Sequence, residues 1–211
     1  GFAEHRDFLP CCGAYGFLNS DEYYSCIKAY REKGYQVFAG AEIDYAKEVE
    51  NEIMNALEKE KYDYTICSIH MIDNISVSDK KNTDYLMSTA ELGKILEGYY
   101  HELDCCIGSG KFDVIGHIGV YKRYIPTEFF EKNSYKKLID ELEHALVRKC
   151  ASSESIVEVN TSGLFSPYGQ TLADTGFIKE YFGLGGRRIS IGSDAHDAAF
   201  AGRGFDVAEK L

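Results

Sequence analysis

The chain has 211 residues and a formal net charge of −11, because 34 Asp and Glu outnumber 23 Lys and Arg. Hydrophobic residues make up 45% of it and charged residues 27%, a globular rather than disordered composition. No stretch approaches the roughly 18 apolar residues of a membrane span. The acidic balance weighs against a nucleic-acid partner, since nucleic acids are bound through clustered Lys and Arg. We expect one domain over residues 1–211 with no membrane and no nucleic-acid partner; the sequence does not determine the oligomeric state.

The cysteines indicate a reducing compartment. There are 7, with two adjacent pairs, Cys11-Cys12 and Cys105-Cys106, and no pair is spaced as CxxC. An odd number without such spacing predicts neither a disulfide framework nor a structural zinc knuckle. We therefore expect unpaired thiols and a cytoplasmic protein. Because the chain starts at Gly1, inside a predicted strand, we also expect a segment upstream of it.

Short apolar runs alternate with amphipathic patterns along the whole chain. Runs of this kind are typical of strands buried on both faces. In chain order, the predicted strands are 1–5, 35–44, 62–70, 112–117, 155–160 and 188–194. The predicted helices are 20–33 with a Ser20 cap, 45–59, 84–106, 134–149, 171–182 and 198–211. Leu92, Ile95, Leu96, Tyr99 and Leu103 share one face of the third helix, and Leu138, Leu142, Ala145 and Leu146 share one face of the fourth.

Alternating strands and helices at this spacing predict parallel βα units. Side chains that can bind metals stand at or just after the strand ends: His5, Glu42, His70, His117, Glu158, Asp194 and His196. In a closed βα barrel these ends meet on one face, whereas an open sheet would spread them along an edge. We therefore expect a closed barrel and one cluster.

A single His or Glu at a strand end is more often a hydrogen-bonded loop residue than a ligand. Here 4 of the 6 His residues stand at strand ends, so the pattern favours a metal site. Mixed imidazole and carboxylate ligands suit Zn²⁺, Mn²⁺ or Fe. Closely spaced ions favour hydrolysis of a phosphate ester.

The same residues resemble a known family. The motifs are Gly1-Phe-Ala-Glu-His5, Ala41-Glu-Ile-Asp44, Asp63 to Met71, Phe112 to His117 with Lys122-Arg-Tyr124, Glu158 to Gly163, and Gly192-Ser-Asp-Ala-His196 with Gly202-Arg-Gly-Phe205. In this order they resemble the PHP (polymerase and histidinol phosphatase) superfamily, and within it the monofunctional histidinol-phosphatase branch.

The resemblance implies a distorted (β/α)7 barrel of the TIM-like kind, which we expect to be truncated at both ends, with two or three divalent metal ions. Glu42 would bridge two ions, His70 and His117 would complete one site, Asp194 would help hold the other, and His5 and His196 would belong to a third. A metal-bound hydroxide held by Glu42, His70, His117 and Asp194 would hydrolyse L-histidinol phosphate, a step of histidine biosynthesis. Glu158 and Asn160 are expected to orient neighbours rather than bind metal.

Three departures from the family pattern keep alternatives open. A His-x-His pair on the first strand is missing, which leaves a non-catalytic PHP-like chain as one alternative. Phe165 stands where the family has an Arg, and Leu172-Ala173 replaces a Tyr-Pro pair. A PHP phosphoesterase for another small phosphorylated metabolite is therefore the second alternative. Without that Arg, the cations expected to bind the substrate phosphate are Arg6, Arg123 and Arg203.

Overall fold

Six parallel strands form the central sheet of the protein. The structure is a computed structural model and describes residues 1–132 and 135–211. The strands lie side by side in chain order, and each predicted strand is present: β1 (Phe2–His5), β2 (Ala39–Asp44), β3 (Tyr64–Ser68), β6 (Val114–Ile115), β7 (Ile156–Asn160) and β8 (Ile189–Gly192). Parallel neighbours in chain order are what repeated βα units produce.

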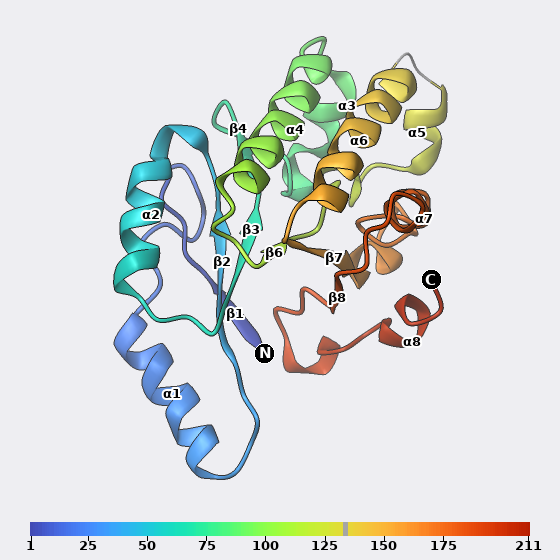
Figure 1. The fold of residues 1–211 in the computed structure, drawn as a ribbon. Coiled ribbons are helices and arrows are strands. Elements are labelled where there is room, and N and C mark those ends of the chain that lie inside the picture. The colour runs from blue at the N-terminus through green and yellow to red at the C-terminus, as the bar shows by residue number, and fades with distance from the viewer. Residues whose placement is uncertain (133–134) are drawn as a thin grey trace.

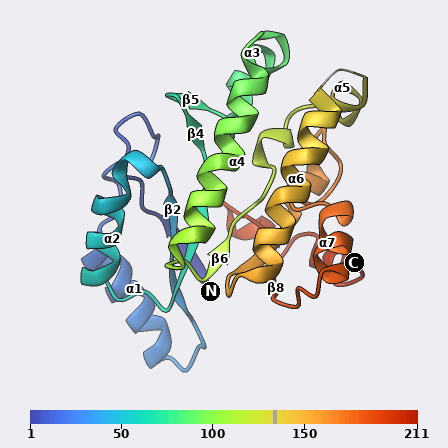
Figure 2. The same ribbon diagram turned by 45° about the horizontal axis from the view of Figure 1, so that its top comes forward.

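Helices cover the outer side of this sheet, and α4 and α6 run side by side across it in both views (Figures 1 and 2). The α-helices are α1 (Ser20–Glu32), α2 (Glu50–Lys59), α3 (Thr83–Ser88), α4 (Leu92–Ser109), α5 (Thr127–Lys132), α6 (Tyr135–Ser152), α7 (Thr175–Gly183) and α8 (Phe205–Ala208). Short 3₁₀ turns are η1 (Lys47–Val49), η2 (Lys80–Asn82), η3 (Val120–Lys122), η4 (Thr161–Phe165) and η5 (Ala198–Phe200).

The sheet curls like part of a barrel. β1 and β8 are its two edges, yet the ring of His5 at the end of β1 lies 5.9 Å from the ring of His196 after β8. Opposite edges can approach in this way only when the sheet bends strongly around. The described residues supply six strands to this sheet and no pairing of β8 with β1, whereas the resemblance implies a barrel of seven strands and complete closure.

Strand alternation separates apolar from polar side chains. In β2, Ala41 and Ile43 face the helices in the main hydrophobic core, while Glu42 and Asp44 point to the opposite face, because successive strand residues alternate. The same alternation in β7 places Val157 and Val159 outward and Glu158 and Asn160 inward. The inner face of the curled sheet is therefore polar where the strands end.

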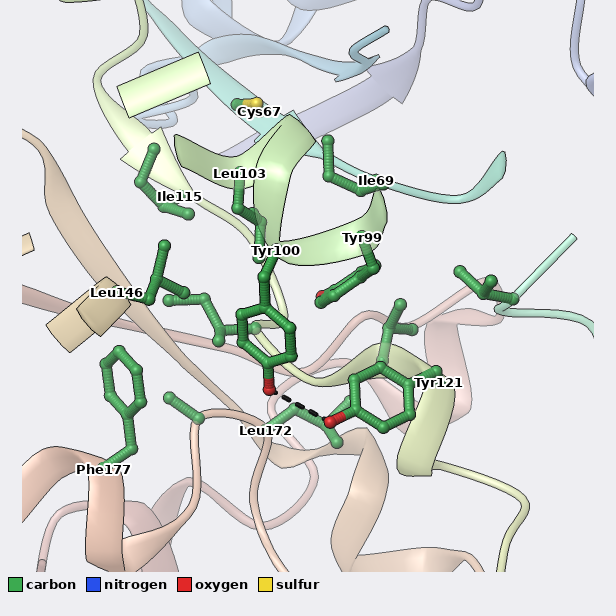
Figure 3. Packing of buried hydrophobic residues seen from close by; sticks show 14 of the residues in the cluster. Cys67, Ile69, Tyr99, Tyr100, Leu103, Ile115, Tyr121, Leu146, Leu172 and Phe177 are labelled. Carbon is green, nitrogen blue, oxygen red and sulfur yellow. Dashed lines mark hydrogen bonds between the residues drawn. The ribbon is translucent and has the colours of Figure 1, made fainter. Parts of the chain in front are cut away.

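The core lies between the sheet and α4, α6 and α7. Figure 3 shows Leu103 of α4, Ile115 of β6 and Leu146 of α6 packed together, all almost completely buried. Each such side chain contributes about 1.5–3 kcal/mol when it is removed from water. Two buried tyrosines, Tyr100 and Tyr121, share a hydrogen bond of 3.0 Å (Figure 3). This core supports the strand ends from behind.

Several predicted boundaries are wrong for local reasons. The strand expected from residue 35 begins only at Ala39. The cap of α1 is Asn19, whose side chain accepts from the Glu22 N–H, and Ser20 is instead the first helical residue. The helix predicted over 84–106 is two helices, because Thr89 takes an extended conformation between α3 and α4.

Later helices also differ from expectation. The buried face of α6 is built by Ile139, Leu146, Val147 and Cys150, whereas Ala145 is exposed. Helix α7 begins after Asp174, which caps it, rather than at residue 171. The helix expected over 198–211 reduces to η5 and α8, and the predicted start of the fourth helix at residue 134 lies outside the described residues.

Two further features correct or extend the sequence predictions. Cys67 of β3 and Cys106 of α4 form a disulfide, so the expectation of seven unpaired thiols is wrong for these two. A small β-hairpin, β4 (Met71–Ile72) with β5 (Ile75–Ser76), follows β3. Its two-residue turn is Asp73-Asn74, and both residues are left-handed, as such hairpin turns require. Of the helices in the described ranges, none is long and apolar enough to cross a membrane.

Candidate metal centre

Four of the predicted ligands meet at the carboxyl ends of neighbouring strands. His5 ends β1 and stands directly beside Glu42 of β2 in the sheet register. His70 follows β3, and His117 follows β6. Because parallel strands present their carboxyl ends at the same edge, residues 112 positions apart along the chain become neighbours.

The distances show that these side chains converge on one another. His117 Nε2 lies 2.8 Å from Glu42 Oε1 and 3.1 Å from His70 Nε2. His70 Nε2 lies 3.5 Å from Glu42 Oε1, and His5 Nε2 lies 3.7 Å from Glu42 Oε2. Glu42 is therefore at the centre, with three imidazoles around its carboxylate.

The electrostatics of the cluster follow from burial and from this carboxylate. Burial alone would raise the pKa of Glu42, but the hydrogen bond from His117 and the nearby His70 and His5 lower that pKa well below its usual range. Burial opposes charge on His117, yet the bond to Glu42 outweighs it and raises the pKa of His117. Burial lowers the pKa of His70. Asp7, whose Oδ1 is 3.7 Å from His5 Nδ1, raises the pKa of His5 to about 9.

Buried polar groups hold two of the predicted ligands, His70 and Glu42, in place. Asp44 Oδ1 accepts from the His70 backbone N–H at 2.7 Å, and Asp44 Oδ2 accepts from Cys12 Sγ at 2.8 Å. Ser68 Oγ donates to Glu42 at 2.7 Å. Sequence reasoning missed Asp44 as a functional residue; its position two residues after Glu42, hence on the same strand face, was the available signal.

Glu158 holds the backbone of His117, one of the predicted ligands. Its Oε2 accepts from the His117 backbone N–H at 2.7 Å and from Asn160 Nδ2 at 3.1 Å. Its burial raises the pKa of this carboxyl. Gly192 on β8 permits this position, because a Cβ atom there would stand 1.8 Å from Glu158 Oε1. The absence of a side chain at residue 192 is thus part of the site.

Asp194 and His196 lie at the edge of the cluster. The Asp194 carboxylate pairs with the guanidinium of Arg123, and Ser162 Oγ lies 3.4 Å from its Oδ2. His196 is largely exposed, and its ring contacts that of His5 at 5.9 Å. Both residues face the same cleft as His5 and His70. Their role as metal ligands stays a prediction.

The backbone is strained at two of these residues. His117 and Asp194 have φ of 22° and 50°, in the left-handed region that non-glycine residues rarely adopt. Such strain costs of order 1–3 kcal/mol and persists where the surroundings impose it, commonly at functional sites. His117 follows β6 and directs its Nε2 at Glu42 and His70, and Asp194 follows β8 and lines the cleft.

A cleft of about 820 Å³ opens over the cluster. Its walls come from loops after β1, β3, β6, β7 and β8, and include Arg123 and Arg203. Arg6 instead pairs with Glu60 at 3.1 Å and lies against the Phe8 ring. Of the three arginines predicted to bind phosphate, the structure therefore brings two into the cleft.

The donor set fits a transition-metal ion. In a tetrahedral site with bonds of about 2.0–2.1 Å, neighbouring ligand atoms lie roughly 3.3 Å apart. The contacts among Glu42, His70 and His117 span 2.8–3.5 Å, and one donor atom each from His5, Glu42 and His70 lies within 4.8 Å of the others. Two imidazole nitrogens facing each other at 3.1 Å are well suited to a shared cation.

A curled parallel sheet with imidazole and carboxylate ligands at its strand ends defines the class of α/β barrel proteins with a metal centre. Sequence comparison then identifies the family within this class. The chain belongs to the PHP domain family, whose sequence model matches residues 1–162. The family predicted from the motifs is confirmed.

Named relatives agree with this assignment. The chain is 29% identical over 213 residues to a probable histidinol-phosphatase of Clostridium acetobutylicum, covering 99% of this chain and 78% of the relative. It is 28% identical over 189 residues to a probable histidinol-phosphatase of Thermotoga maritima, covering 90% of this chain and 67% of that protein. A solved structure of Lactococcus lactis histidinol phosphate phosphatase, complexed with Zn, L-histidinol and phosphate, superimposes with a TM-score of 0.78 at 22% identity, covering 99% of this chain and 80% of that one. This last similarity confirms the TIM-like fold.

Proposed function

We propose that the chain is a metal-dependent phosphomonoesterase that hydrolyses L-histidinol phosphate to L-histidinol and phosphate. The observation that carries the proposal is the convergence of His5, Glu42, His70 and His117 beneath an open cleft, in a chain of the PHP family. The relatives named histidinol-phosphatases support the substrate. Histidine biosynthesis in the cytoplasm is the setting that this activity implies.

The proposal includes two or three divalent ions, Zn²⁺, Mn²⁺ or Fe. Glu42, His70 and His117 would hold one, Glu42 and Asp194 a second, and His5 and His196 a third. Such ions lower the pKa of water and neutralise phosphoryl charge. The solved relative that contains Zn supports the choice of metals. The position of Asp194 beside the cluster supports its assignment to the second ion. Its negative charge contributes to raising the pKa values of His5 and His117.

The chain's own residues would bind and orient the substrate. Arg123 and Arg203 face the cleft and supply positive charge for the phosphate oxygens. Asp44 and Glu158 hold the backbone of His70 and of His117, so the two imidazoles are positioned before any ligand arrives. The cleft is open enough to admit a small phosphorylated molecule.

The test is phosphate release from histidinol phosphate by protein purified without chelator, together with its metal content by elemental analysis. We expect bound metal and turnover in the parent chain, and loss of both in His70→Ala and Glu42→Gln. His101→Ala is the matched control, because His101 is exposed on α4, away from the cleft. Metal-free parent protein without turnover would favour the non-catalytic alternative.

A second candidate substrate class follows from Phe165. This ring covers part of the cleft wall, where it is 47% exposed, so it shapes what the cleft accepts. Another small phosphorylated metabolite is therefore the runner-up. A panel of phosphomonoesters assayed beside histidinol phosphate separates the two, since the preferred substrate has the highest kcat/KM.

A further inference from the structure

Two aromatic rings in the cleft wall lie against one arginine. The Arg203 guanidinium carbon lies 3.5 Å from the centroid of the Phe165 ring and 5.4 Å from that of Phe200. Both rings are about half exposed, and all three side chains line the cleft. A guanidinium stacked at 3.5 Å has a flat face covered while its N–H edge stays free to donate.

The backbone of this arginine is held by the same segment that supplies one of the rings. Thr161 Oγ donates to the Arg203 carbonyl at 2.6 Å, and Thr161 and Phe165 are the two ends of η4. Gly202 and Gly204 on either side of Arg203 are both left-handed, with φ of 74° and 83°. The turn is therefore tight, and η4 holds the backbone from which the Arg203 side chain extends.

The charge of Arg203 is not neutralised within the described part of the chain. Arg123, the other arginine of the cleft, pairs with Asp194, and Arg6 pairs with Glu60. Among the described residues, no carboxylate forms an ion pair with the Arg203 guanidinium. A stacked guanidinium with a free edge is suited to bidentate contact with a phosphate group.

We propose that Phe165, assisted by Phe200, is a positioning residue that stacks on Arg203 and aims its guanidinium edge at the substrate's phosphate oxygens. The inference rests on the proposed function and goes further, because it gives Phe165 a role in orienting Arg203, the cleft arginine without an ion-pair partner among the described residues. Phe165, which stands where the family has an Arg, then contributes by holding the charged side chain of Arg203 in place.

The experiment measures the dissociation constant of inorganic phosphate for the Zn-loaded protein by calorimetry. Removing a charged hydrogen bond in Arg203→Met raises this constant about tenfold or more. Loss of stacking in Phe165→Leu raises it about threefold to fivefold. Phe165→Tyr keeps the aromatic face and binds like the parent. Arg187→Met is the matched control, since Arg187 also lies over a ring, that of Phe182, but does not line the cleft.

A double variant separates positioning from a general structural effect. If Phe165 acts through Arg203, Phe165→Leu has no further effect in the Arg203→Met background. The same order appears in KM for histidinol phosphate, with kcat and zinc content less affected. Phosphate binding in Arg203→Met equal to the parent, equal losses in Phe165→Leu and Phe165→Tyr, or no phosphate binding by the Zn-loaded parent overturns the inference. Phosphate binding that depends on Arg203 without turnover of histidinol phosphate would overturn the proposed substrate and leave this inference standing.

Discussion

At the scale of single residues, the second carboxylate of β2 is the clearest functional group outside the predicted ligands. Asp44 is buried, which raises the pKa of its carboxyl, and both its oxygens are occupied. One oxygen accepts from the backbone N–H of His70, so Asp44 fixes the backbone position from which the imidazole extends. Groups that orient metal ligands in this way affect metal affinity almost as strongly as the ligands.

We therefore predict that Asp44→Asn weakens Zn²⁺ binding by about 10- to 100-fold. The amide keeps one acceptor but turns a donor toward the neighbouring N–H or toward Cys12. Affinity is measured by competition with a chromogenic chelator. Asp21→Asn, on the exposed face of α1, is the control and should bind like the parent. Equal affinities for Asp44→Asn and the parent would remove Asp44 from the site.

At the scale of elements, a buried lysine joins the segment after β6 to two helices. Lys122 ends η3 and is buried, with its Nζ 2.6 Å from Glu143 of α6 and 3.4 Å from Asp174 at the start of α7. Arg123, the next residue, points into the cleft. The adjacent pair thus anchors the loop on one side and serves the site on the other.

Removing this lysine leaves two carboxylates without their cation. We predict that Lys122→Met lowers the free energy of unfolding by about 3–5 kcal/mol, the usual cost of breaking a buried ion pair. Lys136→Met is the control: Lys136 pairs with Asp140 on the exposed surface of α6, where such a pair is worth about 0.5 kcal/mol or less. Urea unfolding of both variants measures the two losses in free energy of unfolding. Similar losses would show that the buried ion pair stabilises the protein no more than the exposed one.

The same contact predicts a pH dependence. Burial would raise the pKa of Asp174, but Lys122 and hydrogen bonds from the Phe177 N–H and Tyr168 outweigh burial and lower it. A carboxyl with a lowered folded-state pKa stabilises fully above its unfolded pKa, about 3.9, and less as pH falls through the folded value.

Asp174→Asn keeps the helix cap and removes the charge. We expect its unfolding free energy to fall short of the parent's by a constant amount at pH 5–7, and this deficit to shrink below about pH 4. Urea titrations of both proteins between pH 3 and pH 7 measure the difference. A deficit that is unchanged down to pH 3 would contradict the assignment.

At the scale of the whole molecule, the curl of the sheet matters more than any one strand. It brings β1 and β8, the two edges, close enough for His5 and His196 to touch. It also presses β8 against the Glu158 side chain of β7, where only glycine fits at position 192. The site therefore depends on how tightly the sheet bends.

Gly192→Ala tests that dependence. The new methyl group would meet Glu158, which supports His117, so we predict about 1–3 kcal/mol lower stability together with reduced zinc content. In Gly183→Ala, at the end of α7, no atom lies within 4 Å of the added carbon, and stability should change by less than about 1 kcal/mol. Retention of the full zinc content in Gly192→Ala would show that Glu158 can move without disturbing the centre.

Sequence patterns by themselves determined the six strands, their parallel arrangement, the family, and the metal-type residues at the strand ends, because each of these depends on short local patterns along the chain. Strand alternation and the placement of His and Glu at strand ends do not depend on how the side chains pack. Helix boundaries were less secure, since caps such as Asn19 and Asp174 depend on single side chains.

Only the tertiary structure decided which polar groups meet. The pairing of Arg123 with Asp194, the support of His70 by Asp44, and the stacking of Arg203 on Phe165 join residues 26 to 71 positions apart or on separate loops. No local pattern encodes such contacts, because they arise when the curled sheet brings the loops after different strands over one cleft. The sequence determined which residue types stand at the strand ends. The positions of the cleft arginines relative to these residues follow from the bend of the sheet.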